Sequence, residues 1–518
     1  MMAPGVSVSE IFVTSGYPEF TFVAPGIYAK LVNALGQKTG GVVIEGPSGI
    51  GKTVAVTRAV QQLGEALGTV AILSSRDSGE VSRIREIAAE KPDGTWIVED
   101  FHHLPLKDRR ALADAIKYLA DQTDPGCKIV LIGINNAGQS LLAGSSDLLT
   151  RITMIEFERN PDELVEELVG LGEQWLNIRI PDHELIVAEA RGSFLLAQLI
   201  CREACDAAGL VEEHHGVEAR VLEVDVAEVI RNVLADLGRQ FEEVCRRFAR
   251  GKKPKRSGRA PYLQCLRWLA EGNEWSIQLE RAADRNPRYK GSVTQILTKN
   301  FLAQHIKDDP EIAKLLHLSD EGFLSVEDPR FVFYLRHIDW DEYREQIGFG
   351  PESQANYDFA LSFAGPQRDL ARHVHEVLSE SGFGVFFDEV EKGRMLGEDL
   401  RSYLAPIYAS GAEIVLVVLG PEYPKRYWTA FEQDQYNGRI AKGSVIPIWT
   451  PDTEPTFASE LTDKGALVLS TSSPGAQELE GAVDALSAAL EKRVASDNLQ
   501  TSLPGLAAAL DLEAPSPG

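Results

Sequence analysis

Short runs of consecutive apolar residues alternate with longer amphipathic stretches over residues 41–157. The runs lie at 41–45, 70–73, 96–98, 128–132 and 153–157. Continuous apolar runs are typical of parallel strands that are buried on both faces, and the amphipathic stretches between them supply the crossover helices. The pattern predicts an α/β core with a parallel sheet.

The pattern changes after residue 161. Segments 161–176 and 181–207 have helical apolar spacing and predict a helical lid. Residues 246–259 hold eight Lys or Arg in 14 positions, with glycine and proline among them, and predict a solvated linker. Helix-like stretches at 262–269 and 293–302, with a strand-like run at 331–335, indicate a small winged-helix unit that ends near Trp340. Residues 341–356 have the composition of a second linker.

Alternation of strands and helices resumes at Tyr357 and continues until a polar, proline-containing tail begins near Ser496. The chain is therefore expected to be multidomain α/β. The expected segments are 1–158 (nucleotide-binding core with an N-terminal extension), 159–245 (lid), 246–345 (basic linker and winged helix), 346–355 (linker), 356–490 (second α/β domain) and 491–518 (flexible tail).

Composition narrows the class of protein. The 518 residues carry a net charge of −25, which disfavours coating by nucleic acid over the whole chain. No apolar run approaches the 18 or more residues of a membrane span, and residues 1–10 lack the features of a secretory signal. We therefore expect a cytoplasmic protein without a membrane partner. The five cysteines form no CxxC pair, so they are interpreted as buried thiols.

A phosphate-binding motif follows the first strand and precedes a helical run at 54–67. The motif GxxxxGK[ST] comprises Gly46, Pro47, Ser48, Gly49, Ile50, Gly51, Lys52 and Thr53. Its backbone N–H groups can surround phosphates, Lys52 can neutralise the β- and γ-phosphates, and Thr53 can bind Mg²⁺. ATP with Mg²⁺ is the predicted ligand.

A P-loop site also needs acids at the end of a neighbouring strand. Glu99 and Asp100 follow the run at 96–98, and we assign Glu99 to Mg²⁺ and Asp100 to the attacking water. Asn135, one strand later, is a candidate γ-phosphate sensor, and a turn residue is the alternative interpretation.

Residues from about 16 to 340 together resemble an AAA+ or STAND-type ATPase with a P-loop core, a helical lid and a winged helix. The resemblance implies that Arg151 could reach the γ-phosphate in a neighbouring subunit, although pairing on its own surface is the commoner role of such an arginine. Gly192 and Ser193 resemble a nucleotide-sensing motif of the lid. In this class the winged helix usually locks or unlocks the nucleotide cleft.

The C-terminal region has predicted strands at 357–364, 384–387, 413–419 and 445–449 and a helix at 368–381. Phe387 and Asp388 stand at the end of the second strand, and Gly397 and Leu400 follow in a Gly-x-x-Leu motif. This order and these motifs resemble a TIR domain, in which the loop 388–397 would be the BB loop. The resemblance implies a flavodoxin-like fold with a central parallel sheet. TIR enzymes that consume NAD⁺ carry their catalytic glutamate at the position of Glu432, with Trp428 on the same helical face. Phe363, Ala364 and Asp388 would line the NAD⁺ crevice.

These resemblances predict an immune sensor and effector. A phage-derived or nucleic-acid trigger, or a separate sensor protein, would act through ATP to cause homo-oligomerisation, and the TIR domain would then hydrolyse NAD⁺ to nicotinamide and ADP-ribose or a cyclic form. Depletion of NAD⁺ would arrest the host cell. Two alternatives remain: a non-enzymatic TIR adaptor controlled by an ATPase switch, and a P-loop regulator that binds nucleic acid.

Overall fold

The computed structural model describes residues 5–134, 151–252, 259–272, 274–350, 355–388, 399–420, 423, 435, 438–440, 442–449, 465–469 and 474–510. The chain divides into two compact units. The first comprises Met1–Val244, Leu269–Gln278 and Asp309–Ile338, and the second comprises Cys245–Trp268, Leu279–Asp308 and Asp339–Gly518. The region predicted as a winged helix is thus divided between the two units.

A five-stranded parallel sheet forms the centre of the first unit, in the order β2-β3-β4-β1-β5. Its strands are β1 (Gly41–Glu45), β2 (Val70–Ser74), β3 (Gly94–Glu99), β4 (Cys127–Ile132) and β5 (Ile152–Glu156). Every residue of β1 and β4 is buried, which explains why their sequences are apolar apart from Glu45 and Lys128. This order is that of an AAA+-like core and confirms the predicted fold class.

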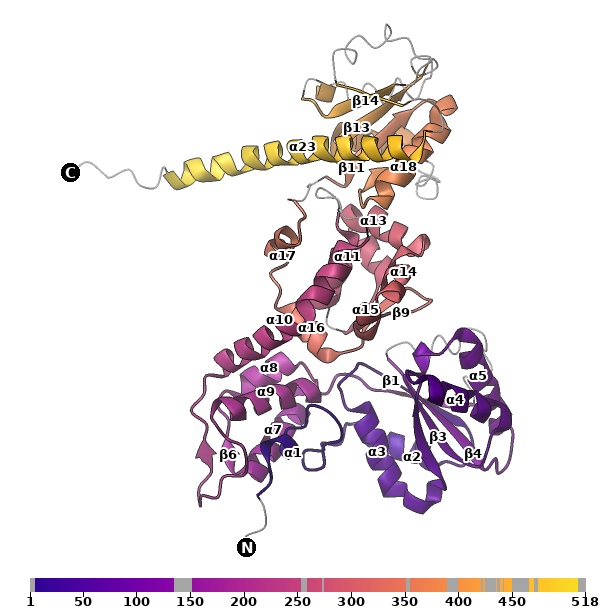
Figure 1. Cartoon of the computed structure of the whole chain (residues 1–518), viewed down its shortest axis with the longest axis vertical. Coiled ribbons are helices and arrows are strands. Elements are labelled where there is room, and N and C mark those ends of the chain that lie inside the picture. Colours follow the sequence, from indigo (N-terminus) through magenta and orange to yellow (C-terminus); the bar gives the residue numbers. More distant parts are fainter. Residues whose placement is uncertain are drawn as a thin grey trace, which may run out of the picture. The chain divides into compact units, whose positions relative to one another are not determined.

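Helices cover the sheet in pairs (Figure 1). The pairs are α2 (Tyr28–Gly36) with α3 (Lys52–Leu63), and α4 (Ser78–Glu90) with α5 (Leu106–Ala120). A short helix, α1 (Val8–Ile11), precedes them, and its N-cap Ser7 forms a capping box with Glu10.

The lid contains α7 (Asp162–Leu176), α8 (His183–Ala190) and α9 (Phe194–Ala207), with a small parallel pair of strands, β6 (Ile178–Arg179) and β7 (Arg220–Val221). The segment 181–207, which has helical apolar spacing, forms two helices, α8 and α9. Arg191 and Gly192 both have positive φ, 45° and 80°, so the chain leaves the helix there and Ser193 caps α9.

An antiparallel sheet in the order β8-β10-β9 completes the first unit. Its strands are β8 (Ser276–Gln278), β9 (Leu316–Leu318) and β10 (Phe323–Val326), and α15 (Pro310–Leu315) leads into β9. The strand predicted at 331–335 was wrong, because these residues lie in α16 (Pro329–Arg336). Asp328 caps this helix and Pro329 occupies its first turn, while burial of most of the helix gives it the apolar run of a strand.

The second unit contains another five-stranded parallel sheet, in the order β12-β11-β13-β14-β15. Its strands are β11 (Tyr357–Phe363), β12 (Val385–Phe386), β13 (Ala412–Leu419), β14 (Val445–Trp449) and β15 (Leu467–Val468). Helices α18 (Arg368–Glu380) and α23 (Ala476–Leu510) pack together, and α20 (Leu400–Pro406) precedes β13. Order 2-1-3-4-5 is the flavodoxin-like arrangement that the sequence predicts.

Helices α10 (Val226–Arg250) and α11 (Pro261–Glu271) have residues in both units. The remaining helices of the second unit are α12 (Leu279–Arg285), α13 (Pro287–Thr298), α14 (Phe301–Asp308) and α17 (Trp340–Gln346). Three expectations are corrected here. Arg259, placed in a solvated linker, is 2% exposed. Residues 340–346 form a helix capped by Asp339 rather than a linker. Finally, α23 continues to Leu510, past the predicted start of the tail.

All five cysteines are buried, as predicted: Cys127, Cys201, Cys205, Cys245 and Cys265. Within the described residues, none of the helices combines the length and apolar character that a bilayer crossing requires.

Candidate functional site

The P-loop joins β1 to α3 and depends on three glycines with positive φ. The φ values are 150° for Gly46, 73° for Gly49 and 96° for Gly51. A Cβ atom on Gly46 would lie 2.4 Å from the carbonyl oxygen of Phe157. Side chains are therefore excluded from this loop by conformation and by space, which leaves its backbone N–H groups for a phosphate.

Three side chains at the start of α3 and the end of β3 fit ATP and Mg²⁺. Lys52 Nζ donates to the carbonyl oxygens of Gly46 at 2.7 Å and Pro47 at 2.6 Å. Thr53 Oγ1 donates to Glu99 Oε1 at 2.6 Å, so a hydroxyl and a carboxylate lie together where a magnesium ion needs oxygen ligands. Burial lowers the pKa of Lys52 to about 8, against the opposing effect of nearby carboxylates.

Asp100 differs from Glu99 in its surroundings. Its backbone has φ 53°, and its carboxylate Oδ2 lies 2.6 Å from Arg76 Nε. The same guanidinium reaches Glu327, with Arg76 Nη2 2.7 Å from Glu327 Oε2. Arg76 and Glu327 were not predicted, because 251 residues separate them in the chain and neither belongs to a motif.

A cavity of about 450 Å³ opens beside the P-loop. Its size suits a small-molecule ligand. The predicted residues that line it are Ser48, Gly49, Gly51, Lys52, Thr53, Glu99 and Asp100, and the others include Val13, Thr21, Phe22, Val23 and Pro25 of the N-terminal segment and Phe194 and Gln198 of the lid. The N-terminal segment carries no motif, so no role was predicted for it. Its lining residues are mixed, and Val13, Phe22, Val23 and Pro25 offer apolar surface that suits a nucleotide base.

The lid and α16 both contact the P-loop. Asn160 Nδ2 donates to the carbonyl oxygen of Ile50 at 3.1 Å, and Ser193 Oγ donates to that of Gly49 at 3.4 Å. A Cβ on Gly49 would lie 2.6 Å from Pro329 Cγ, which places the first turn of α16 directly against the loop. Gly192 and Ser193 thus lie at the nucleotide cleft.

Two further predicted ATP residues have different outcomes. Asn135 lies outside the described residues. Arg151 Nε lies 3.1 Å from Asp121 Oδ1 of the same chain, so the surface pairing is present, and a role in a neighbouring subunit stays a prediction.

The predicted NAD⁺ crevice lies at the carboxyl edge of the second sheet. From β11 the chain goes first to β12 on one side and later to β13 on the other, and ligands of open α/β sheets bind at such a switch point. Phe363 ends β11, Ala364 follows it, and Asp388 comes shortly after β12. The Arg368 guanidinium lies 5.1 Å from the centre of the Phe363 ring, and its Nη1 is 3.4 Å from Asp388 Oδ1. Arg368 was not predicted, although it follows β11 by five residues.

Polar groups in β11 and in the segments that follow β11 and β13 form more of this edge. Ser362 and Tyr423 share a hydrogen bond between their hydroxyls, and a Cβ on Gly420 would overlap the Gln367 amide. Trp428, Glu432 and residues 389–397 of the BB loop lie outside the described residues, so the catalytic carboxylate stays a prediction.

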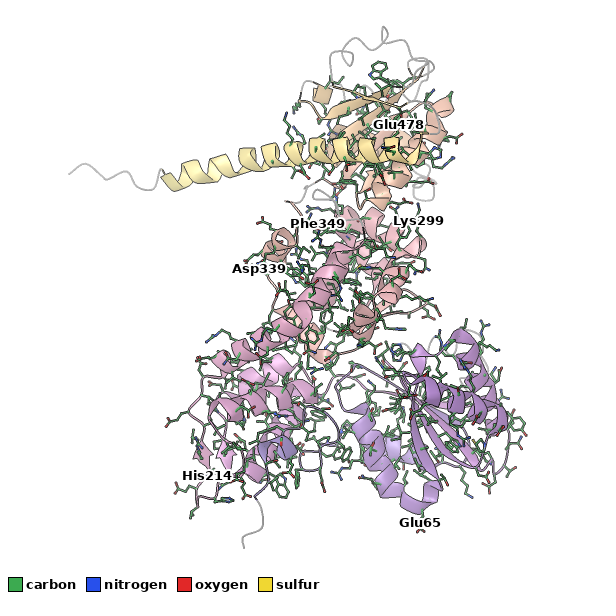
Figure 2. The ribbon with its side chains drawn as sticks, viewed as in Figure 1. Glu65, His214, Lys299, Asp339, Phe349 and Glu478 are labelled. Atoms are coloured by element: carbon green, nitrogen blue, oxygen red, sulfur yellow. The ribbon has the colours of Figure 1, made fainter. Side chains whose placement is uncertain are left out.

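A buried ion pair holds the chain before α11 to the amino end of β11. Arg259 Nε donates to Asp358 Oδ2 at 2.8 Å, and Gly384 N–H donates to the same oxygen at 2.8 Å. The side chains of Arg259 and Asp358 are 2% and 1% exposed. Lys299, labelled in Figure 2, adds an exposed pair, with Nζ 3.3 Å from Glu380 Oε1.

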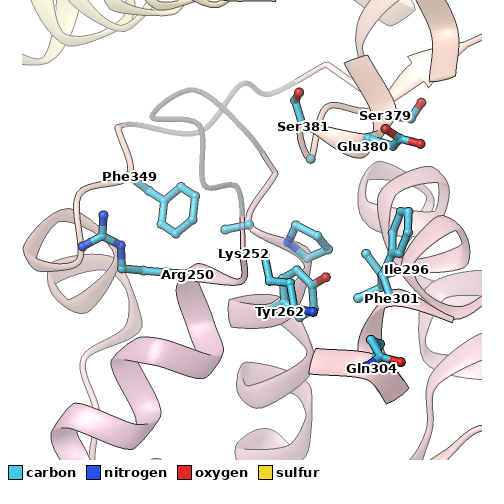
Figure 3. A pocket seen from close by; sticks show the side chains of 13 residues that line it. Arg250, Lys252, Tyr262, Ile296, Phe301, Gln304, Phe349, Ser379, Glu380 and Ser381 are labelled. Carbon is cyan, nitrogen blue, oxygen red and sulfur yellow. The ribbon is translucent and has the colours of Figure 1, made fainter. Parts of the chain in front are cut away.

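A second cavity, of about 300 Å³, lies beside this contact (Figure 3). Tyr262, Ile296 and Phe301 line it from the α11–α14 side, and Ser379, Glu380 and Ser381 line it from the end of α18. None of the residues predicted for ATP or NAD⁺ lines it.

Comparison with known proteins finds one enzyme that is similar to part of the chain. No family model matches the chain. The 3′ cyclic ADP-D-ribose synthase AaTIR from Aquimarina amphilecti is 34% identical over 101 residues, which cover 19% of this chain and 31% of that relative. Part of this chain is therefore homologous to a TIR enzyme. The chain spans about a third of the relative's length.

Two solved structures overlap with larger parts of the chain. A RuvB variant from Thermotoga maritima has 15% identity and a TM-score of 0.33, covering 60% of this chain and 96% of RuvB. The ORC1 protein of Aeropyrum pernix, in complex with DNA, has 14% identity and a TM-score of 0.35, covering 65% and 95% of the two chains. These TM-scores are too low to support an inference about the fold. The AAA+-like fold of the first unit is inferred from its strand order and its P-loop.

Proposed function

We propose that this chain is an ATP-controlled enzyme that cleaves the nicotinamide–ribose bond of NAD⁺, giving nicotinamide and linear or cyclic ADP-ribose. The observation that carries the proposal is the homology of part of the chain to a 3′ cyclic ADP-D-ribose synthase. The crevice at the switch point between β11 and β13 is where such a sheet takes its ligand.

The chemistry requires one fixed anion. The electron pair of the glycosidic C–N bond moves to nicotinamide, which leaves as a neutral molecule and needs no general acid. Oxygen from water or from a ribose hydroxyl then bonds to the same carbon and releases one proton. The Glu432 carboxylate would stabilise the positive charge that develops on the ribose in the transition state.

The described residues of the crevice suit the rest of the substrate. Phe363 offers an aromatic surface, and the Arg368 guanidinium suits the pyrophosphate of a dinucleotide. Asp388 would repel that pyrophosphate, but its contact with Arg368 offsets the negative charge. These roles are part of the proposal.

Control by ATP would act through the contacts of the P-loop. Ser193 of the lid and Pro329 of α16 both touch Gly49, and Arg76 bridges Asp100 and Glu327. Phosphates and Mg²⁺ that enter the cavity would compete for the contacts of Lys52, Thr53 and Glu99. Because these residues adjoin the P-loop, this competition would change the contact between the loop and the start of α16. We propose that this change permits homo-oligomerisation after a phage-derived or nucleic-acid trigger, and that NAD⁺ loss then arrests the infected cell.

The first experiment measures NAD⁺ loss by the purified chain at several protein concentrations, with ATP and Mg²⁺, and separates products by chromatography. We expect nicotinamide to appear in step with the loss of NAD⁺. Glu432→Gln should lower the rate by about 100- to 1,000-fold, the usual cost of removing one electrostatic contact to a transition state. The matched control is Glu413→Gln, on β13.

Two results would count against the proposal. No NAD⁺ loss by the concentrated wild type would overturn the enzyme and leave the adaptor. Equal rates for wild type and the Glu432 variant would remove that residue from the chemistry. Protection of cells from phage by the wild type, and not by Glu432→Gln, would test the immune role separately.

A further inference from the structure

Three histidines and a glutamate meet in the first unit, outside the P-loop and the TIR crevice. His102 and His103 belong to the short helix Phe101–His103 that follows β3, His317 is the middle residue of β9, and Glu327 follows β10. One donor atom from each lies within 4.8 Å of the others. The proposed control by ATP involves only Glu327 of this cluster, through Arg76, and the proposed NAD⁺ chemistry uses none of it.

The fold brings these residues together from both sides. In the antiparallel pair β9 and β10, His317 is opposite Ser325. Glu327 is two residues beyond Ser325 and therefore faces the same side as His317. From the other side, Asp100 has φ 53°, which turns the chain after β3 and presents His102 and His103 to the hairpin.

Two of the imidazole nitrogens lie close to one carboxylate oxygen. Glu327 Oε1 lies 3.0 Å from His102 Nε2 and 3.1 Å from His103 Nε2, and the His317 ring centre is 4.9 Å from that of His102. The other oxygen, Oε2, is held by Arg76. His102 is 5% exposed, and its Nδ1 has no hydrogen-bond partner in the described part of the chain.

We propose that His102, His103, His317 and Glu327 form a binding site for one divalent transition-metal ion, with Zn²⁺ the ion that best matches the donors. Imidazole nitrogens and carboxylate oxygens are both ligands that zinc takes in tetrahedral sites. Bonds of about 2.0–2.1 Å in a tetrahedron place neighbouring donors roughly 3.3 Å apart. The His102–Glu327 and His103–Glu327 separations, 3.0 and 3.1 Å, are close to that edge, and the donor atom of His317 lies within 4.8 Å of the others.

Four protein ligands leave no open position, so the site is structural rather than catalytic. It clamps the β9–β10 hairpin to the end of β3. Arg76 links the clamp to the ATP site, because the same guanidinium holds Glu327 Oε2 and Asp100. An outer arginine of this kind orients the carboxylate and tunes the affinity for the metal.

The test uses the full chain, stripped by a chelator and kept in excess Mg²⁺ so that the P-loop cation position is filled. Zn²⁺ is titrated against a chromophoric chelator, and Co²⁺ is followed by its visible spectrum. We expect one tight equivalent per chain, the ligand-field bands of tetrahedral Co²⁺, and a higher melting temperature with metal than without.

Variants separate this site from general metal binding. His317→Ala and Glu327→Gln should weaken Zn²⁺ binding beyond the roughly 10- to 100-fold expected for Arg76→Ala, which removes an outer partner only. His215→Ala, at an exposed histidine outside the cluster, should bind as the wild type does. Melting temperatures of the metal-free proteins identify any variant that is simply unfolded, and Glu327→Gln, which keeps the size of its side chain, then decides.

The absence of a tight equivalent in the wild type would overturn the proposal. So would a tight equivalent that survives unchanged in both His317→Ala and Glu327→Gln. In either case the cluster is a hydrogen-bonded His–Glu network without a metal.

Discussion

The two parallel sheets of this chain are held at opposite ends. In the first, the contacts from the lid and from α16 fall at the carboxyl end of β1, where Ser193 and Pro329 touch the P-loop at Gly49. In the second, the buried pair Arg259–Asp358 falls near the amino end of β11. Both sheets place their predicted ligand at the carboxyl edge.

The contact at the ligand end of the first sheet and the contact at the amino end of the second sheet should have different effects. A contact at the ligand end would compete directly with the phosphates of the proposed ATP, so we propose that the first sheet reports whether nucleotide is bound. A contact at the amino end holds the second sheet without using Phe363, Ala364 or Asp388. Changes at Arg259 should therefore alter the attachment of the TIR sheet, and changes at Gly49 or Lys52 should alter nucleotide binding.

The largest effect is expected from Arg259→Met. Removing one partner of a buried ion pair leaves the other charge uncompensated and costs about 3–5 kcal/mol. Hydrogen exchange of the β11 amides, measured by mass spectrometry, should show that the free energy of opening falls by this amount relative to the wild type. Asp358→Asn should act in the same direction, because it removes the charge that Arg259 needs.

Two controls accompany that measurement. Arg259→Met with Asp358→Leu should recover part of the loss, since no charge remains buried, although Gly384 N–H loses its acceptor. Lys299→Ala breaks only an exposed pair and should cost about 1 kcal/mol or less. Equal losses from Lys299→Ala and Arg259→Met would contradict the importance of the buried pair.

The second largest effect is expected from Lys52→Ala. Loss of a charged hydrogen-bond donor to phosphate should weaken ATP binding by about 1.5–3 kcal/mol, or roughly 10- to 150-fold. Calorimetric titration with ATP and Mg²⁺ measures it, with the exposed Lys38→Ala as control. The hydrogen exchange of the β11 amides should not change, because Lys52 belongs to the first unit and β11 to the second. An ATP affinity equal to that of the wild type would remove Lys52 from the site.

The P-loop was predictable because its determinants are contiguous. Eight consecutive residues contain the glycines with positive φ, the lysine and the threonine, so local sequence alone carries the signal. The parallel strands were predictable for a similar reason, since burial on both faces leaves an apolar run in the sequence.

Contacts between distant segments could not be predicted in the same way. Arg76 and Glu327 are 251 residues apart, and Arg259 and Asp358 are 99 apart, so no spacing rule connects them. The strand predicted at 331–335 failed because a helix buried on most sides has the same apolar run as a buried strand. The basic composition of residues 246–259 likewise predicted that Arg259 lies in a solvated linker. It is buried instead, because Asp358 compensates its charge.

Gly49→Ala tests the contact at the ligand end of the first sheet. Its Cβ would lie 2.6 Å from Pro329 Cγ, at a backbone φ of 73°, so we expect a loss of about 1–3 kcal/mol in the free energy of unfolding of the first unit. Adding Pro329→Ala removes the clashing Cγ atom and should restore part of the lost free energy of unfolding. The part caused by backbone strain at residue 49 should remain. Additive losses in the double variant would mean that α16 does not press on the loop.

The smallest effect is a pH dependence of ATP binding. Burial lowers the pKa of Lys52 to about 8, so the free protein loses this positive charge as the pH rises through that value. Bound phosphates require the protonated amine. The dissociation constant for ATP should therefore be insensitive to this group well below pH 8 and should rise by up to about tenfold per pH unit above it. Lys52→Arg keeps its charge throughout this range and should bind with no such step. If its affinity for ATP falls above pH 8 as steeply as that of the wild type, the titrating group is not Lys52, and the ligand end of the first sheet is governed by another residue.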